Sequence, residues 1–201
     1  MDRKLIYIGN GILILIVLVG TLVYFLAKPA SFRGTLYGEP LPPAAEIELA
    51  KPDGGTFRLS DQRGKIVLLF FGYTACPDVC PTTLAEMTQV MKKLGDQSDD
   101  TQVVFISVDP KRDTPEKVQE YVLRFDSRFI GLSGSQTNLE PIWQSYSIFR
   151  EEVEGSTAAG YIVNHTARLY LVDADGNLRL SYAYGTPVED IVHDLKILLD
   201  K

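Results

Sequence analysis

The two residue types that carry most soft-metal and thiol chemistry are scarce in this chain. Its 201 residues include only two cysteines and two histidines. So few soft ligands exclude a disulfide-stapled scaffold, a four-cysteine zinc site and a multi-centre metal cluster. Any redox or soft-metal chemistry must therefore involve Cys76, Cys80, His165 or His193.

The chain also lacks a run of basic residues. It holds 20 Lys and Arg against 26 Asp and Glu, which gives a net charge of −6. Because nucleic-acid binding relies mostly on Lys and Arg, this balance argues against a nucleic-acid partner. No Ser/His/Asp or metallohydrolase pattern is found, which argues against a hydrolase. The overall proportions, 45% hydrophobic and 23% charged residues, are those of an ordinary globular domain.

One long apolar run is present at the N-terminus, at residues 5–27. At about 1.5 Å per residue, a helix of this length reaches roughly 34 Å, and a hydrocarbon core is about 30 Å thick. The run exceeds the roughly 7–15 apolar residues of a signal peptide, and no clean cleavage site follows it. We therefore expect residues 1–27 to form an uncleaved transmembrane anchor.

The orientation of this anchor is less clear from the flanking charges. Arg3 and Lys4 precede the run, whereas Lys28 and Arg33 follow it, so the positive-inside bias is slight. The cysteine pair favours placing the body outside the cytoplasm, and the segment lacks the features of an organellar import signal. We expect a single-pass protein of a bacterial inner membrane whose soluble domain faces the periplasm.

The remainder reads as a linker followed by one domain. Residues 28–43 are rich in Pro and Gly and predict a linker, which leaves residues 44–201 for a single globular domain. Hydrophobic patterns predict strands at 45–50, 56–59, 66–71, 103–108, 167–172 and 178–183, and helices at 79–94, after Thr114, at 138–148 and after a capping box at Thr186–Glu189. This order predicts an α/β, thioredoxin-like fold with an N-terminal β-hairpin extension.

Cys76 and Cys80 lie between a predicted buried strand and a predicted helix. A spacing of four brings both sulfurs to one helix face, and unpaired N–H groups at a helix start stabilise thiolates. A structural disulfide is disfavoured, because so small a loop would contribute only about 2 kcal/mol. Two interpretations remain open: a dithiol/disulfide couple that exchanges with other proteins, or two thiolate ligands for a soft metal such as Cu(I) or Zn.

A metal site of this kind needs a third ligand. His165 immediately precedes the predicted strand at 167–172, and in a thioredoxin-like sheet the loop entering that strand packs beside the cysteines. A lone histidine is more often a surface or core residue, so this position alone does not decide the matter. His193 lies opposite the apolar stripe of the last helix, and we expect it to be exposed. Asp78 could cap the helix or act on a partner.

The segments GKIVLLFFGYTACPDVCPTT, FISVDPKRDTPEKVQEYV, FIGLSGS and YIVNHTARLYLVDADGNL resemble the Sco/SenC family of copper-binding proteins. The resemblance implies a thioredoxin-like fold, a membrane anchor, and copper, as Cu(I) or Cu(II), bound by Cys76, Cys80 and His165. It also implies delivery of that copper to the binuclear site of cytochrome c oxidase subunit II. Members often carry His where this chain has Ala75 and Asp where it has Asn164, which could alter copper affinity or transfer.

Copper handling and thiol exchange use the same two sulfurs, so other features must separate them. The C-x-x-x-C spacing, and the lack of proline between Pro141 and Pro187, differ from a typical thioredoxin-like reductase and favour copper. The predicted function is therefore a membrane-anchored copper chaperone without enzymatic activity. Its predicted partners are subunit II and other periplasmic copper carriers or thiol-disulfide proteins. The alternatives are a thiol-disulfide reductase that keeps the acceptor cysteines reduced and a thiol redox sensor.

Overall fold

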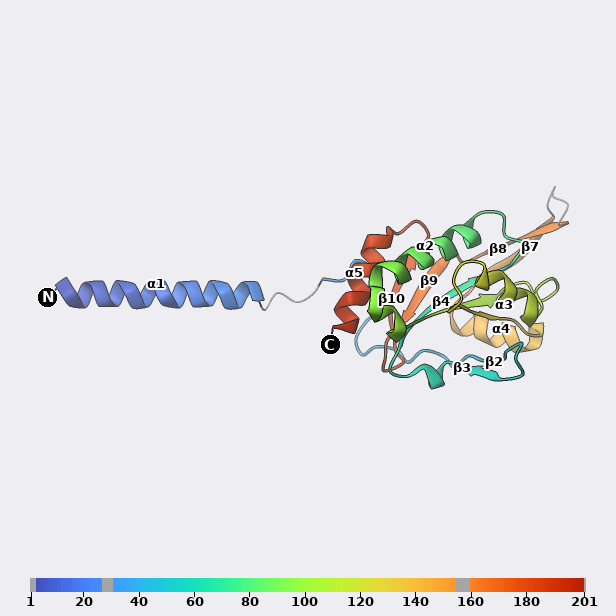
Figure 1. The fold of residues 1–201 in the computed structure, drawn as a ribbon, viewed down its shortest axis with the longest axis horizontal. Coiled ribbons are helices and arrows are strands. Elements are labelled where there is room, and N and C mark those ends of the chain that lie inside the picture. Colours follow the sequence, from blue (N-terminus) through green and yellow to red (C-terminus); the bar gives the residue numbers. More distant parts are fainter. Residues whose placement is uncertain (1–2, 27–30, 155–159, 201) are drawn as a thin grey trace. The chain divides into compact units, whose positions relative to one another are not determined.

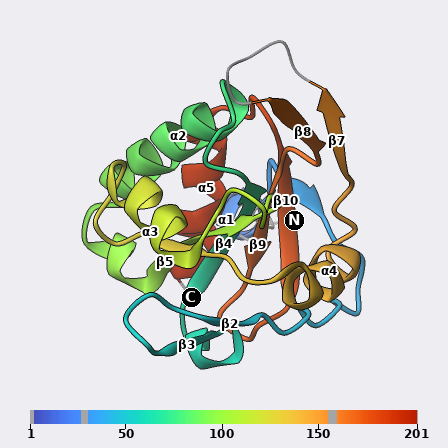
Figure 2. The same cartoon turned by 90° about the vertical axis from the view of Figure 1, so that its right-hand side faces the viewer.

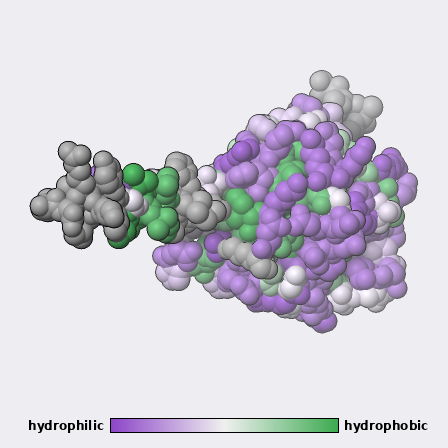
Figure 3. Space-filling model, turned by 60° about the vertical axis from the view of Figure 1, so that its left-hand side comes forward, coloured by the Kyte–Doolittle hydropathy of each residue, from purple (hydrophilic) through white to green (hydrophobic). Residues whose placement is uncertain are grey.

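The computed structural model describes residues 3–26, 31–154 and 160–200, and it separates into two compact units, Met1–Ser31 and Phe32–Lys201. The first unit contains the helix α1 (Arg3–Leu26), and Figure 3 shows its described surface as hydrophobic. Within the described residues, no helix combines the length and apolar character needed to cross a membrane. The predicted anchor at residues 1–27 extends over positions outside the described part of the chain, so it stays a prediction.

The second unit is built on a six-stranded mixed sheet (Figure 1). The strand order is β1-β10-β9-β4-β5-β6. Strands β4, β5 and β6 are parallel to one another, β9 is antiparallel to β4, and β10 is antiparallel to β9. The bounds are β1 (Thr35–Leu36), β4 (Ile66–Gly72), β5 (Thr101–Ser107), β6 (Ile130–Leu132), β9 (Arg168–Val172) and β10 (Leu178–Ala183). Every residue of β4 is buried, as expected of a central strand covered on both faces.

Helices cover both faces of this sheet. Figure 2 shows α2 (Val79–Leu94), α3 (Pro115–Leu123) and α5 (Val188–Leu199) on one face and α4 (Gln136–Ser145) on the other. The hairpin of β2 (Glu48–Ala50) and β3 (Thr56–Arg58) is antiparallel and forms a separate two-stranded sheet. This arrangement confirms the predicted α/β, thioredoxin-like fold, including the N-terminal hairpin, and α2 has the predicted bounds. Its apolar stripe, Leu84, Met87 and Met91, is buried as expected from helical spacing.

The structure differs from the sequence-based expectations in a second hairpin, formed by β7 (Arg150–Glu154) and β8 (Tyr161–His165). The sequence of β7 is Arg-Glu-Glu-Val-Glu, which lacks the alternation of a half-buried strand and therefore predicts no strand. His165 consequently lies at the end of a strand, whereas the sequence predicted a loop.

The capping box predicted for the last helix is wrong. The N-cap of α5 is Pro187, and no side chain caps the helix. The Thr186 hydroxyl instead donates a hydrogen bond to the Ala183 carbonyl oxygen, 2.8 Å away, so it serves the preceding turn. A Ser or Thr hydroxyl can either accept a hydrogen bond from a helix N–H or donate one to a nearby carbonyl, and Thr186 makes the second kind of bond.

Part of the segment predicted as a linker belongs to the sheet. Thr35 and Leu36 form β1 and pair with β10. The backbone N–H groups of Arg33 and Gly34 donate hydrogen bonds of 2.8 to 3.1 Å to the carboxylate of Asp194, which is fully buried in α5. The second unit therefore incorporates the chain from Phe32 onward.

Candidate metal centre

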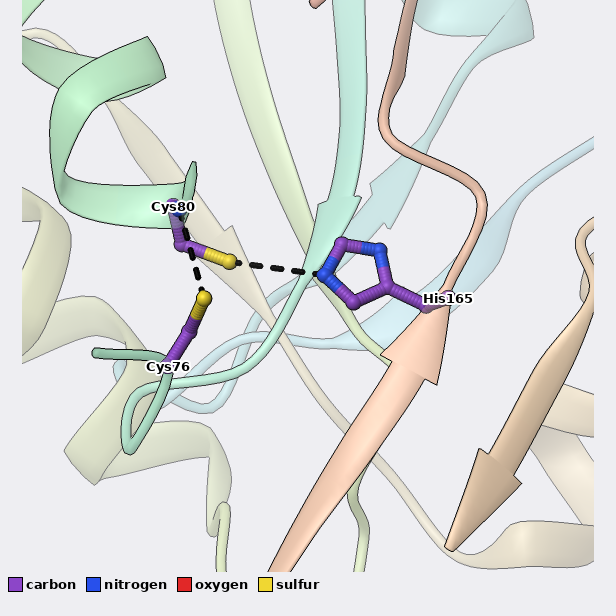
Figure 4. A group of neighbouring side chains, drawn as sticks. All are labelled: Cys76, Cys80 and His165. Atoms are coloured by element: carbon purple, nitrogen blue, oxygen red, sulfur yellow. Dashed lines mark hydrogen bonds between the residues drawn. The ribbon is translucent and has the colours of Figure 1, made fainter. Parts of the chain in front are cut away.

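Two cysteines and one histidine meet above the end of β4 (Figure 4). Cys76 lies in the loop between β4 and α2, Cys80 lies in the first turn of α2, and His165 is the last residue of β8. Their ligand atoms, two sulfurs and one imidazole nitrogen, all lie within 4.8 Å of one another. The two cysteines are free thiols.

The two sulfurs come together for a different reason than the predicted shared helix face. Cys76 lies outside α2, and its sulfur accepts a hydrogen bond from the backbone N–H of Cys80 over 3.4 Å. Asp78, at the N-cap position, makes no side-chain capping bond. The Cys76 sulfur therefore occupies the place at the helix N-terminus where the unpaired N–H groups favour a negative charge.

The pKa values of Cys76 and Cys80 are shifted in opposite directions by the contact between their sulfurs. The hydrogen bond from the Cys80 thiol, together with His165 and the backbone N–H groups of Asp78 and Cys80, outweighs burial and lowers the pKa of Cys76 from 9.0 to about 4. The same hydrogen bond, together with burial, raises the pKa of Cys80. At neutral pH the metal-free pair is thus a Cys76 thiolate and a Cys80 thiol.

His165 is oriented by its backbone and by aromatic neighbours. Its Nδ1 lies 3.2 Å from the carbonyl oxygen of Thr166, a contact that fixes the orientation of the ring. The Tyr73 ring packs edge-on to the imidazole with centroids 5.8 Å apart. Nε2 is then left facing the Cys80 sulfur at 3.7 Å, which is the orientation a metal ligand needs.

Access to the three ligands is unequal. Cys80 is fully buried, whereas Cys76 and His165 are half-buried. A cavity of about 220 Å³ opens beside them, lined by Tyr73, Cys76, Pro77, Asp78, Val79, Ile162, Val163, Asn164, His165 and Ala167. A partner must therefore approach from the side of Cys76 and His165.

The second histidine does not join this cluster. His193 was expected to be exposed, but its side chain is only 35% exposed because Nδ1 lies 3.0 Å from the buried carboxylate of Asp194. That carboxylate also accepts a hydrogen bond from the Tyr182 hydroxyl. His193 therefore belongs to the packing of α5 rather than to the metal centre.

Sequence reasoning missed the residues that support the centre. Asp113 is buried and accepts hydrogen bonds from the backbone N–H and the hydroxyl of Thr74, two residues before Cys76. The Tyr73 hydroxyl accepts a bond from the Val163 N–H of β8. One signal was available: carboxylates that directly follow a buried parallel strand gather at the same sheet edge as the loop after the neighbouring strand.

The chemistry of this donor set is that of a soft-metal site. Two thiolate sulfurs and one imidazole nitrogen suit Cu(I), and also Zn. The protein-family model SCO1/SenC matches residues 40–200. The chain belongs to the SCO1/SenC family. A SCO2-like protein of Rickettsia felis is 32% identical over 199 residues, which cover 94% of this chain and 97% of that relative.

Solved structures connect the same fold to copper and to thiol chemistry. The structure of Bradyrhizobium japonicum ScoI with copper bound is 35% identical, with a TM-score of 0.70, and the match covers 78% of this chain and 99% of that one. A second solved structure is that of BsSco, a member of the Sco family of cytochrome c oxidase assembly proteins in which a disulfide switch was identified. It is 25% identical with a TM-score of 0.64, and the match covers 82% of this chain and 98% of that one. The predicted family and copper are thereby confirmed: this is a Sco-family copper-binding protein with a Cys-Cys-His cluster.

Proposed function

We propose that this chain is a copper carrier that binds copper through Cys76, Cys80 and His165 and delivers it to the binuclear copper site of cytochrome c oxidase subunit II. The observation that carries the proposal is the meeting of two sulfurs and one nitrogen within 4.8 Å. The copper-bound ScoI relative and the oxidase-assembly role stated for BsSco support it.

The proposed setting is a bacterial inner membrane, with residues 1–27 as anchor and the copper-binding domain, which begins at Phe32 instead of at the predicted residue 44, in the periplasm. The apolar run at 5–27 supports the anchor. Tethering the domain to the membrane that holds the oxidase raises its effective concentration there. A reporter fused after Lys201 tests the orientation, and activity of a cytoplasm-only reporter would contradict it.

Loading and release follow from the unequal cysteines. Cys76 is already a thiolate before copper arrives, whereas Cys80 must give up its proton to become a ligand. During transfer, acceptor thiolates reach Cys76 and His165 first, because Cys80 is fully buried. Cys80 is therefore the last ligand to release copper and recovers its proton when it does. Each step exchanges one ligand for another and requires no net oxidation.

The central experiment measures copper stoichiometry and affinity on the reduced full-length chain. We expect one copper per chain in the wild type and at least tenfold weaker binding in His165→Ala, since one of three ligands is lost. His193→Ala is the matched control and should bind as the wild type does, because His193 lies outside the cluster. Unchanged binding in His165→Ala would refute the ligand assignment, and transfer to a purified subunit II copper domain tests delivery.

Thiol-disulfide exchange is a second candidate, favoured by the lowered pKa of Cys76. The Cys76 thiolate would attack an acceptor disulfide and release one acceptor thiolate. Cys80, after losing its proton, would then attack Cys76 in the mixed disulfide, which reduces the acceptor by two electrons and oxidises the pair to a disulfide. His165 is not needed for these steps. A His165→Ala variant that reduces the acceptor as fast as wild type, together with a wild type that takes up no copper, would favour this function.

A further inference from the structure

We infer that the turn Asp109–Asp113 positions both halves of the copper site, one carboxylate for the cysteine loop and the other for the strand that ends at His165. The inference rests on the proposed copper-carrying function and adds positioning residues to it. The turn follows β5 and is closed by a hydrogen bond of 3.0 Å from the Asp113 N–H to the Asp109 carbonyl oxygen. This bond closes the backbone turn that carries both carboxylates.

The first contact of the turn is with the cysteine loop. Asp113 is 1% exposed, and its carboxylate accepts hydrogen bonds from the Thr74 N–H at 3.0 Å and the Thr74 hydroxyl at 2.6 Å. The Ser107 hydroxyl donates a third bond, at 2.8 Å, and the Lys117 ammonium lies 3.7 Å away. Because Thr74 lies two residues before Cys76, this carboxylate determines where the cysteine loop leaves β4.

The second contact is with β8. Asp109 is fully buried and accepts a hydrogen bond of 2.7 Å from the Tyr161 hydroxyl, and it also pairs with Arg112. Arg112 donates from Nη1 to the Tyr161 carbonyl oxygen at 2.8 Å, and its guanidinium stacks 3.7 Å above the Tyr161 ring. The first residue of β8 is therefore held by its hydroxyl, its ring and its backbone together. His165 is the last residue of the same strand.

Such contacts are needed because β7 and β8 form a separate two-stranded sheet and are not among the strands paired in the six-stranded one. An isolated two-stranded hairpin is marginally stable at best. Side chains attach this hairpin to the body: the Tyr73 hydroxyl accepts from the Val163 N–H at 3.3 Å, and Arg150 donates to the Val108 carbonyl oxygen at 2.9 Å. The attachments at Tyr161 and Val163, together with the packing of the His165 ring against Tyr73, lie on the strand that carries His165.

The test compares Tyr161→Phe with Tyr170→Phe in the full-length chain. Both variants keep the aromatic ring and lose one hydroxyl group. Tyr170 lies on β9, and its hydroxyl donates a hydrogen bond of 3.1 Å to the Tyr146 carbonyl oxygen. Copper affinity is measured together with the nitrogen hyperfine coupling in the electron paramagnetic resonance spectrum of the Cu(II) form. We expect Tyr161→Phe to weaken copper binding about tenfold and to shift the nitrogen coupling toward that of His165→Ala. Tyr170→Phe should leave both unchanged.

The contact of the turn with the cysteine loop and its contact with β8 predict different effects on copper affinity and on the nitrogen coupling. Thr74→Val removes the hydroxyl bond to Asp113 and should weaken copper binding while leaving the imidazole coupling in place. If Tyr161→Phe does not fold, Arg112→Lys removes the bond to the Tyr161 carbonyl and should act in the same direction. A Tyr161→Phe variant indistinguishable from Tyr170→Phe overturns the inference. A wild type that takes up no copper refutes instead the proposed function on which it rests.

Discussion

Replacing Gly72 by alanine would insert a methyl group between the end of β4 and the buried cysteine of the metal centre. A Cβ at Gly72 would lie 2.7 Å from the Cys80 sulfur and 2.8 Å from Cε2 of Phe105. Separations under 3.0 Å are essentially never seen and ordinary contact begins at 3.4 Å, so the sulfur and the strand must move apart by at least 0.3 Å, and by 0.7 Å to reach ordinary contact. Bonds between a ligand and its metal tolerate about 0.2 Å.

Two separate losses follow from this crowding in Gly72→Ala. Overfilling a packed core costs about 1–3 kcal/mol of the free energy of unfolding. Displacing the sulfur should also weaken copper binding by at least tenfold, which corresponds to about 1.4 kcal/mol. Denaturant unfolding of the copper-free chain measures the first loss, and competition with a copper chelator of known affinity measures the second.

Two other glycines separate these effects. A Cβ at Gly131 would lie 2.6 Å from the backbone oxygen of Val118, in contact with α3, so Gly131→Ala should destabilise the chain without touching the copper ligands. Gly38 has open space around it, and Gly38→Ala should alter neither quantity. The reasoning is refuted if Gly72→Ala binds copper as tightly as Gly131→Ala does.

Two further predictions concern the ionised groups of the second unit. In the copper-free, reduced chain the pKa of Cys76 is lowered from 9.0 to about 4, so its thiolate favours the folded state increasingly as pH rises from about 4 toward 9.0, and this contribution is lost as pH falls through about 4. The rate at which iodoacetamide alkylates Cys76 should therefore be nearly independent of pH between about 6 and 8. The variant Cys80→Ala removes the hydrogen-bond donor, so its alkylation rate should rise with pH. A rate that rises with pH in the wild type would contradict the lowered pKa of Cys76. Asp194→Ala should cost about 3 kcal/mol of the free energy of unfolding, because the buried Tyr182 hydroxyl and the backbone N–H groups of Arg33 and Gly34 lose their acceptor. Asp190→Ala, which breaks only the partly exposed pair with Arg33, should cost about 0–1 kcal/mol, and equal losses in denaturant unfolding would refute this account.

The strength of the local patterns explains which elements were predictable. Residues 66–71 are a continuous apolar run, and residues 79–94 carry apolar side chains at helical spacing, so burial of each segment follows from its own residues. The hairpin β7–β8 was missed because the three glutamates of β7 give no apolar face, and its strands are held by contacts to the turn at 109–113 instead. The capping box failed because one hydroxyl had two local partners to choose between.

By itself, the sequence limited the candidate soft-metal ligands to Cys76, Cys80, His165 and His193 and predicted the elements on which the cysteines lie. The scarcity of Cys and His left few candidates, and their neighbours placed Cys76 and Cys80 at a helix start. Only the tertiary structure decided that His165 lies 3.7 Å from Cys80 across 85 positions of the chain, and that one sulfur is ionised while the other is not. The physical reason is that local patterns report burial and periodicity, whereas distances between remote segments, and the pKa values that depend on them, arise only when the sheet and its buried carboxylates bring those segments together.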